Sequence, residues 1–459
     1  MNQASPRRQL LRLAGPVLIS QLAVMGNGVI DTMMAGHLSS IELAALGLGT
    51  SIYIIGYVSL LSVLLGLSPI VAQHFGAGRM DAIGVAFRQS LLLALILGSF
   101  GCLALMMCSA LTDRFGAPEA VSARVEPYLF WCALGVMPAL IVRAFAALCT
   151  AVSRPRLVMW VNLACLAFKI PLNAVLMYGW GGFGLEAMGA AGAACSSCIL
   201  AFASALAVVL LAKLDPGLKR FNLVARLYPQ RKQMLELLRL GLPIGGTAFI
   251  DVSAFASIAL LIAPFGATAS ASQQIASSLT GVVYMFSLSL ANATMVLTAQ
   301  RLGAGKHADA HVMAKEGMRT AMMTAALMAI LLFTGKELLA RAYASDEAVA
   351  EAAALLIAWL AIHQWLDSLQ LQYAFVLRAH KVTSLPFWIY VGSLWGIGLG
   401  GGAWISFSGW FGSFHDARAF WWAGIAACAL AALALALLSS RVWQRVLYLS
   451  PDKAATQPG

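Results

Sequence analysis

Three carboxylates, Asp31, Asp251 and Asp367, lie within long apolar stretches of the chain. A charged side chain inside a membrane costs about 2.5–3.5 kcal/mol on insertion scales, so it is tolerated only where it faces protein or water. His363 precedes Asp367 by four residues, which places both side chains on one face of a helix. Carboxylates in a low dielectric with an imidazole nearby suit reversible ion binding. We therefore predict that Asp251, Asp367 and His363 bind a coupling ion, either H⁺ or Na⁺.

Two basic residues also fall inside apolar stretches. Lys169 is followed four residues later by Asn173, on the same face of a helix. If the helix of Lys169 packs beside that of Asp31, the ammonium would neutralise the carboxylate, and the alternative is that Lys169 reaches the membrane surface. We therefore expect a polar cluster of Asp31, Asn173 and Lys169. Arg143 either reaches the surface or lines a cavity.

The low fraction of charged residues and the high fraction of hydrophobic residues indicate which class of protein contains these side chains. Of the 459 residues, 61% are hydrophobic and only 11% are charged, whereas soluble domains carry about 25% charged residues. Soluble, disordered and fibrous proteins are therefore excluded. Unbroken apolar runs such as 91–107 lack the alternation of a membrane β-barrel. The chain is predicted to be an all-α polytopic membrane protein.

The apolar runs predict twelve transmembrane helices. Their expected ranges are 13–35, 43–72, 85–111, 128–151, 157–178, 187–212, 235–263, 269–299, 314–335, 349–377, 385–408 and 419–440. With these spans, most lysines and arginines fall in the loops on the same side of the membrane as the two termini. This bias predicts that both termini are cytoplasmic, in a multi-pass protein of the plasma (inner) membrane. The net charge of +11 is explained by this topology, so we expect no nucleic acid partner.

The second half of the chain repeats the first at an offset of 227 residues. The segment 72–79, AQHFGAGR, matches 299–306, AQRLGAGK, and Pro16 matches Pro243. Six spans separate equivalent positions, so the halves have the same orientation. We predict two pseudo-symmetric six-helix lobes around a central cleft, the layout of an alternating-access transporter. The expected boundaries are 1–212 for the N-terminal lobe, 213–234 for a basic cytoplasmic linker, and 235–459 for the C-terminal lobe.

Other motifs carry less chemistry. Cys195 and Cys198 form a CxxC pair without a second pair or a histidine cluster, so we interpret them as packing residues. The Gly-Ala-Gly loops lack the Walker pattern of an ATPase. An ion gradient is therefore the expected energy source. We expect no cofactor and no metal site other than a possible Na⁺ at Asp251 and Asp367.

At these residues the chain resembles the multidrug and toxic compound extrusion (MATE) family, with its NorM branch as the best match. The resemblance covers nearly the whole chain. It rests on Pro16, segment 31–36 (DTMMAG), segment 171–173 (PLN), segment 240–243 (LGLP), segment 364–367 (QWLD) with Leu377-Arg378, and both Gly-Ala-Gly loops. It implies a cation-coupled antiporter that expels amphipathic organic cations.

The resemblance also implies roles for individual residues. Acids matching Asp251 and Asp367 belong to the cation site of the second lobe, and Asp31 with Asn173 belongs to a polar cluster of the first. This chain departs from the family pattern at three positions. It has Asp251 where glutamate is usual, His363 where an aromatic residue is common, and Lys169 where a neutral polar residue, typically asparagine, is expected.

The leading functional prediction is secondary multidrug efflux, without enzymatic activity, by a monomer surrounded by membrane lipid. Aromatic and methionine side chains facing a cleft would give broad selectivity for amphipathic cationic small molecules. The candidates for the cleft are Tyr53, Tyr57, Tyr284, Met285 and Phe286. Helix packing or lipid contact would also explain large apolar side chains at these positions. The alternatives are a lipid-linked saccharide flippase of the same superfamily and a membrane-embedded enzyme. Twelve spans and three central acids argue against the flippase, and the lack of clustered catalytic ligands argues against the enzyme.

Overall fold

The computed structural model describes residues 5–110, 119–179, 186–344, 346–408 and 418–448. Within these residues the chain forms helices and no strands, which confirms the all-α prediction. The chain divides into two compact units. We call residues 19–245 the N-lobe, and residues 1–18 together with 246–459 the C-lobe.

The division between the lobes falls within two helices that each contain a proline. In α1 (Pro6–Leu38) it follows Leu18, two residues after Pro16, and in α9 (Arg231–Ile262) it follows Gly245, two residues after Pro243. A proline inside a helix removes one backbone hydrogen bond and bends the helix. The two division points therefore fall at equivalent positions of the internal repeat, each two residues after a proline inside a helix.

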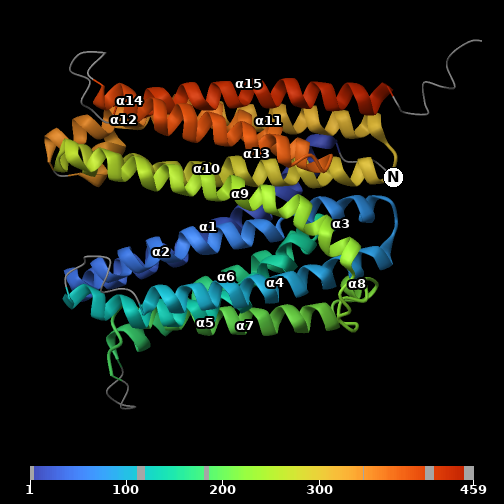
Figure 1. Ribbon diagram of the computed structural model, residues 1–459, viewed down its shortest axis with the longest axis horizontal. Helices are drawn as coiled ribbons and strands as arrows, with labels where there is room; N and C mark the ends of the chain where they lie inside the picture. Colours follow the sequence, from blue (N-terminus) through green and yellow to red (C-terminus); the bar gives the residue numbers. More distant parts are fainter. Residues whose placement is uncertain (1–4, 111–118, 180–185, 345, 409–417, 449–459) are drawn as a thin grey trace, which may run out of the picture. The chain divides into compact units, whose positions relative to one another are not determined.

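The N-lobe is built around α5. Its helices besides parts of α1 and α9 are α2 (Ser40–Leu64), α3 (Leu67–Gly76), α4 (Met80–Ser109), α5 (Glu119–Ala151), α6 (Pro155–Tyr178), α7 (Ala190–Leu214) and the short α8 (Pro216–Lys219). Helix α5 packs against α2, α4 and α7, and α6 packs mainly against α7 (Figure 1). This arrangement brings the polar faces of α1, α6 and α7 together.

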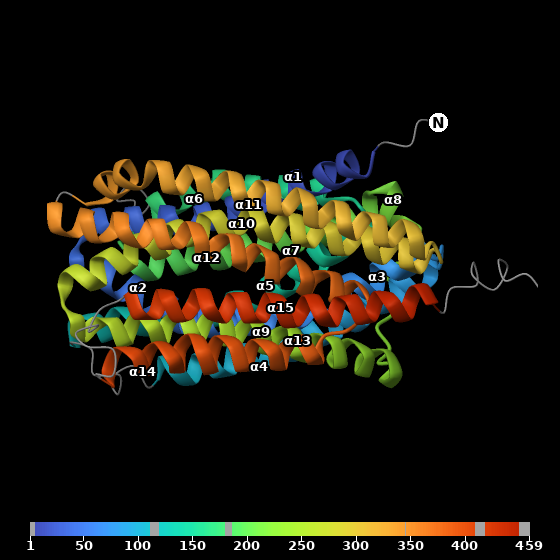
Figure 2. The ribbon, with the colours of Figure 1, turned by 90° about the horizontal axis from the view of Figure 1, so that it is seen from above.

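The C-lobe is built around α12. Its helices besides the rest of α1 and α9 are η3 (Ala263–Phe265), α10 (Ala267–Gly303), α11 (His307–Tyr343), α12 (Glu347–Ala379), α13 (Ser384–Tyr390), η4 (Val391–Gly401), α14 (Gly402–Phe407) and α15 (Arg418–Tyr448). Helix α12 packs against α10, α11 and α15, and Figure 2 shows α13 and α14 alongside α15.

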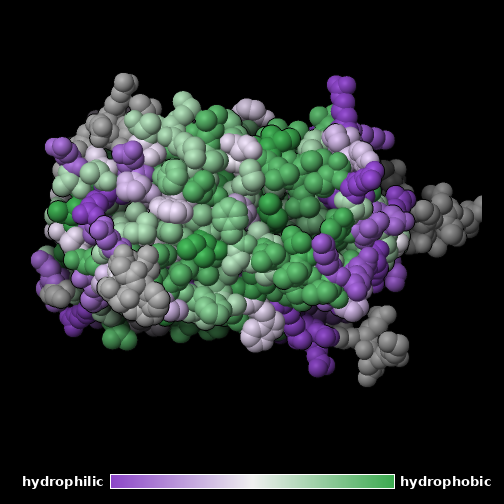
Figure 3. Space-filling model, turned by 90° about the horizontal axis from the view of Figure 1, so that it is seen from below, coloured by the Kyte–Doolittle hydropathy of each residue, from purple (hydrophilic) through white to green (hydrophobic). Residues whose placement is uncertain are grey.

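Eleven helices of the described chain are long and apolar enough to cross a membrane. The twelfth predicted span, 385–408, is formed by α13, η4 and α14 in direct succession. Segment η4 is a π-helix of eleven residues that includes five glycines, and glycine lowers the stability of the regular α-helix. Figure 3 shows one face of the molecule, where hydrophobic side chains cover the middle and hydrophilic side chains gather at both ends.

The internal repeat is reproduced in the backbone. The segment 40–76 of α2 and α3 corresponds to α10 at 267–303, and α4 begins at 80 where α11 begins at 307. Both Gly-Ala-Gly turns have the same geometry, with a positive φ of 70° at Gly78 and 75° at Gly305. Because a positive φ favours glycine, these turns end the preceding helix in the same way in each half.

The predicted linker packs onto the N-lobe. Leu218 and Phe221 are fully buried. Arg88 donates a hydrogen bond to the carbonyl of Asn222 at 2.6 Å, and the Gln89 side chain donates to the carbonyl of Tyr228 at 2.7 Å. These hydrogen bonds attach the chain between α7 and α9 to the N-terminal part of α4.

Glycines let the backbone of α9 approach α2 closely in the N-lobe. A Cβ built on Gly241 would lie 2.2 Å from the carbonyl oxygen of Val63, and one built on Gly66 would lie 3.0 Å from the amide nitrogen of Gly241. Backbone atoms cannot rotate away as a flexible side chain can. The crossing of these helices therefore requires glycine at position 241.

We predict that Gly241→Ala destabilises the protein in detergent, by about 1–3 kcal/mol as is typical of overpacking. The measurement is the thermal unfolding midpoint of the purified protein. Gly47→Ala in α2 is the matched control, because a Cβ there would meet nothing within 4 Å. Its expected effect is neutral or stabilising, since alanine favours helix. Equal midpoints for the two variants would show that the close approach does not limit stability.

Candidate functional site

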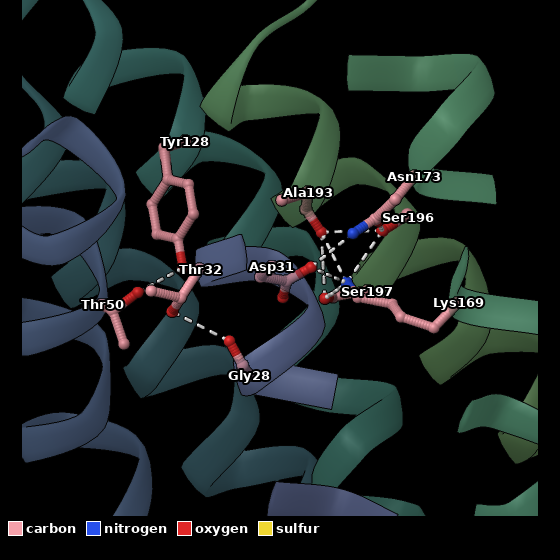
Figure 4. Close-up of polar contacts among 10 residues, drawn as sticks. All are labelled: Gly28, Asp31, Thr32, Thr50, Tyr128, Lys169, Asn173, Ala193, Ser196 and Ser197. Atoms are coloured by element: carbon pink, nitrogen blue, oxygen red, sulfur yellow. Dashed lines mark hydrogen bonds and ion pairs between the residues drawn. The ribbon is translucent and has the colours of Figure 1, made fainter. Parts of the chain in front are cut away.

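The N-lobe holds a buried lysine within the membrane-spanning part of α6. The side chain of Lys169 is completely buried, and its Nζ has four oxygen atoms within 3.0 Å. These are Asp31 Oδ1 at 2.9 Å, the carbonyl oxygen of Ala193 at 3.0 Å, Ser196 Oγ at 2.8 Å and Ser197 Oγ at 2.6 Å. Figure 4 shows these groups converging on the ammonium from α1 and α7.

Asn173 connects the same groups from the next turn of α6. Its Nδ2 donates to Asp31 Oδ1 at 2.6 Å, and its Oδ1 accepts a hydrogen bond from Ser196 (Figure 4). One amide thus contacts the carboxylate and a serine that also accepts from Lys169. The structure therefore brings together all three residues that the sequence places in the N-lobe polar cluster.

In the N-lobe cluster, the positive charge of Lys169 is balanced by the carboxylate of Asp31. An ammonium has three donors, and Lys169 has one carboxylate, one carbonyl and two hydroxyls to receive them. A buried ion pair survives only when such extra hydrogen bonds offset its desolvation. Asp31 is consequently an ion-pair partner in this structure.

The C-lobe holds a second cluster on α12 and its neighbours. Gln370 donates from Nε2 to Asp367 Oδ1 at 2.8 Å, and the same nitrogen lies 3.5 Å from Cys428 Sγ on α15. Cys428 Sγ also lies 3.5 Å from His363 Nε2. The imidazole of His363 packs edge-on against Trp421, with ring centroids 5.7 Å apart.

Asp251 lies on α9, near enough to Asp367 for the charges of the two carboxyl groups to interact. The charged groups close enough to act on its carboxyl are Asp367 and Arg378, and Asp367 in turn acts on His363. Neither Asp251 nor Asp367 makes an ion pair within the described part of the chain. The structure therefore places the three predicted ion-site residues in one lobe, with two acids that carry no paired cation.

Two buried carboxamide oxygens of α12 have no hydrogen-bond partner among the described residues. They are Oε1 of Gln370, which is 2% exposed and donates to Asp367, and Oε1 of the fully buried Gln364. A buried polar atom without a partner is costly, so it marks a place where a ligand or water binds. Carboxylate and carboxamide oxygens are ligands that hard cations prefer.

The predicted cleft residues lie in separate lobes. In the N-lobe the rings of Tyr53 and Tyr57 are stacked, with centroids 5.0 Å apart and an interplanar angle of 12°. In the C-lobe Tyr284 lies close enough to Asp251 and Asp367 to be influenced by both. Met285 and Phe286 are half-buried beside it on α10. Tyr284 thus lies near the acids of the C-lobe, whereas Tyr53 and Tyr57 form an aromatic pair in the N-lobe.

Four residues of these clusters were not predicted from the sequence. Ser196 and Ser197 lie between the two cysteines of the CxxC pair, and Gln370 and Cys428 complete the C-lobe cluster. Gln370 follows Asp367 by three residues, which is a usable helical signal. Cys428 lies on a distant helix, and no local pattern links it to His363.

We predict that Lys169→Met and Asp31→Asn each destabilise the protein, because each leaves one partner buried without its counter-charge, at about 3–5 kcal/mol. The double variant should recover part of the loss. The measurement is the unfolding midpoint in detergent for the four proteins of the cycle. The control cycle uses Arg341→Ala and Glu347→Ala, an ion pair whose side chains are 67% and 66% exposed. If the effects at positions 169 and 31 simply add, the two side chains do not stabilise each other.

Comparisons with known proteins agree with this fold. The family model MatE matches residues 16–175 and 243–404. The chain is 35% identical to the "Probable multidrug resistance protein NorM" of Aromatoleum aromaticum, over 87% of this chain and 86% of that protein. It is 30% identical to the "Multidrug resistance protein NorM" of Vibrio cholerae, over 93% of each chain.

Solved structures show the same fold. One described as "Crystal structure of MATE in the bent conformation" matches with a TM-score of 0.87 at 16% identity, over 97% of each chain. An outward-facing multidrug resistance MATE family transporter matches with a TM-score of 0.86, over 96% of this chain and 97% of that one. The predicted two-lobe, twelve-helix fold class is thus confirmed, and the protein belongs to the MatE family of membrane transporters.

Proposed function

We propose that the protein is a cation-coupled antiporter that exports amphipathic organic cations across the inner membrane, with both termini in the cytoplasm. The names of the similar proteins from Aromatoleum aromaticum and Vibrio cholerae, both multidrug resistance proteins, support export of drugs. The observation that carries the coupling is the pair of acids in the C-lobe. Asp251 and Asp367 are close enough to interact, yet neither is neutralised by an ion pair within the described residues.

Two neighbouring carboxylates that form no ion pair within the described residues would be stabilised by a bound cation. Either a proton or Na⁺ would relieve the repulsion between Asp251 and Asp367. The unpartnered Oε1 of Gln370 adds a neutral oxygen beside Asp367. His363 is close enough to Asp367 to influence its proton affinity.

Exchange follows when ion and drug favour different orientations of the transporter. A ligand shifts a conformational equilibrium only by the difference between its affinities for the two states. In the proposed cycle, ion binding at the acids favours one orientation and drug binding favours the other. Half-buried aromatic side chains such as Tyr284, with few fixed polar groups, would accept many flat cations.

We predict that Asp251→Asn and Asp367→Asn each abolish gradient-driven drug export while the protein is still produced. The amide keeps the shape of the side chain and loses the ionisable charge. The measurement is export of a cationic dye in proteoliposomes, with a pH gradient and an Na⁺ gradient imposed separately.

Asp81→Asn is the matched control, because Asp81 is an exposed acid at the start of α4, outside both clusters. It should transport like the wild type. Export by well-folded Asp251→Asn and Asp367→Asn at the control's rate would refute the assigned ion site. Wild-type protein that responds to neither gradient would refute cation coupling itself.

We predict that His363→Gln flattens the pH profile of export between about pH 5 and 8, the range in which histidine usually titrates. The replacement removes a titrating neighbour of Asp367 and keeps hydrogen-bonding capacity. Initial rates are compared across pH at a constant gradient, and drug binding at one fixed pH should change little. Superimposable profiles for the two proteins would assign His363 to packing against Trp421.

A further inference from the structure

One face of α12 carries a row of buried polar side chains at every fourth residue. Gln364, Ser368 and Gln372 are all fully buried, and residues four apart on a helix lie on the same face. We call these three residues the polar row. Its atoms without a hydrogen-bond partner among the described residues are Gln364 Oε1, Ser368 Oγ, and both Oε1 and Nε2 of Gln372. Such buried atoms mark places where water or another ligand binds.

The polar row begins beside an acid of the proposed ion site. Gln364 precedes Asp367 by three residues and Ser368 by four, so on the helix surface it is a neighbour of both. The Nε2 of Gln364 donates to Ser287 Oγ of α10 at 3.3 Å, and α10 packs against α12. The row therefore starts at Asp367, on the part of α12 that contacts α10.

The same face of α12 leads on to histidines at the end of the helix. The next positions at this spacing are Val376, which belongs to a buried apolar cluster with Trp443 of α15, and His380. The ring of His380 stands perpendicular to that of Trp443, with centroids 4.4 Å apart, and its Nε2 is buried without a hydrogen-bond partner. His311 of α11 also packs against Trp443, with centroids 4.6 Å apart. The polar groups thus extend from the acid to the helix end, with one apolar interruption.

The internal repeat shows that the fold does not need polar side chains at these positions. Helices α5 and α12 each have 33 residues and begin and end 228 residues apart. The same turn follows both, with a φ of 60° at Ser153 and at Lys381. The N-lobe residues equivalent to Gln364, Ser368, Gln372, Val376 and His380 are Val136, Leu140, Ala144, Leu148 and Val152, all buried and apolar. Only the lobe whose acids lack an ion pair within the described residues has the polar row.

These groups have the chemistry that proton transfer requires. A hydroxyl or a water molecule both donates and accepts a hydrogen bond, and an amide binds water through either of its polar atoms. Burial, together with His307 and His311, lowers the pKa of His380 to about 4. Its imidazole is therefore neutral near pH 7, so one ring nitrogen accepts a proton while the other donates one.

We propose that water molecules bound by Gln364, Ser368 and Gln372 carry protons between Asp367 and His380. A proton that leaves the carboxyl of Asp367 enters the nearest water as another leaves the far end of the row, so one proton is moved in each passage. Val376 and Trp443 interrupt the row in this structure, and passage depends on the opening of that apolar contact. This inference rests on the proposed function and selects H⁺ over Na⁺ as the coupling ion.

The first test gives the row the apolar character that its equivalent has in the N-lobe. Gln372→Leu and Ser368→Ala should each lower the initial rate of dye export driven by a pH gradient in proteoliposomes by about tenfold, since positioned proton donors and acceptors contribute at least that much. The thermal unfolding midpoint in detergent should stay equal or rise, because the atoms removed have no hydrogen-bond partner among the described residues. The dissociation constant of the dye in detergent should not change.

Ser289→Ala is the matched control in the same lobe. Ser289 is 2% exposed, and its hydroxyl donates to the carbonyl of Phe286 in its own helix at 2.9 Å. It should export dye at the wild-type rate. Export at the wild-type rate by Gln372→Leu, or a fall in its unfolding midpoint that accompanies the loss of export, would overturn the proposal.

A high-resolution electron cryo-microscopy map of the wild-type protein tests the row without any transport. Water is expected at hydrogen-bond distance from the unpartnered atoms of Gln364, Ser368 and Gln372, and not along the equivalent apolar face of α5. If these atoms bond to protein groups instead, the path is refuted even where export is coupled. Export driven by an Na⁺ gradient alone would refute the path and leave the proposed antiporter intact. Water along the row with no export under either gradient would refute the antiporter and leave the hydrated row in place.

Discussion

An ionised side chain inside a membrane loses its hydration, so the helices must supply the contacts that water would have made. Lys169 shows how completely this requirement is met in the N-lobe, where four oxygen atoms lie within 3.0 Å of its Nζ. The partners come from α1 and α7, while Lys169 and Asn173 belong to α6. The polar faces of these helices therefore meet, and the buried charge helps to specify how α1, α6 and α7 pack.

The two lobes have the same arrangement of helix ends and turns, but they differ in whether their buried acids are paired with a basic residue. The repeat fixes the same helix ends and the same turns at an offset of 227 residues. In the N-lobe, Asp31 is paired with a lysine. In the C-lobe, Asp367 has the neutral amide of Gln370 as its hydrogen-bond donor, and Asp251 has no ion pair among the described residues. An internal duplication has thus given one lobe a compensated cluster, and the other a cluster that we propose to be open to cations.

The sequence predicted the helices and the repeat because both depend on long-range patterns of apolar residues and on glycine and proline. It also predicted which charged residues gather in each lobe, since charges inside apolar runs are rare. Neutral polar partners were missed for a physical reason. Ser196 and Ser197 are compatible with many apolar helices, so they give no signal until the fold brings Lys169 to them. The contact of Cys428 with His363 likewise depends on how α15 packs on α12.

In the proposed antiporter, uncompensated charge links ligand binding to conformation. A lone charge is tolerated while water reaches it and is costly once the site is closed. The acids Asp251 and Asp367 would therefore oppose closure until a cation binds. The bound cation would then favour the closed site, because it removes the desolvation cost of the two acids. Lys169 lacks this property because Asp31 already balances its charge. Coupling is thus expected at the unpaired charges, and the buried ion pair is expected to maintain the fold around them.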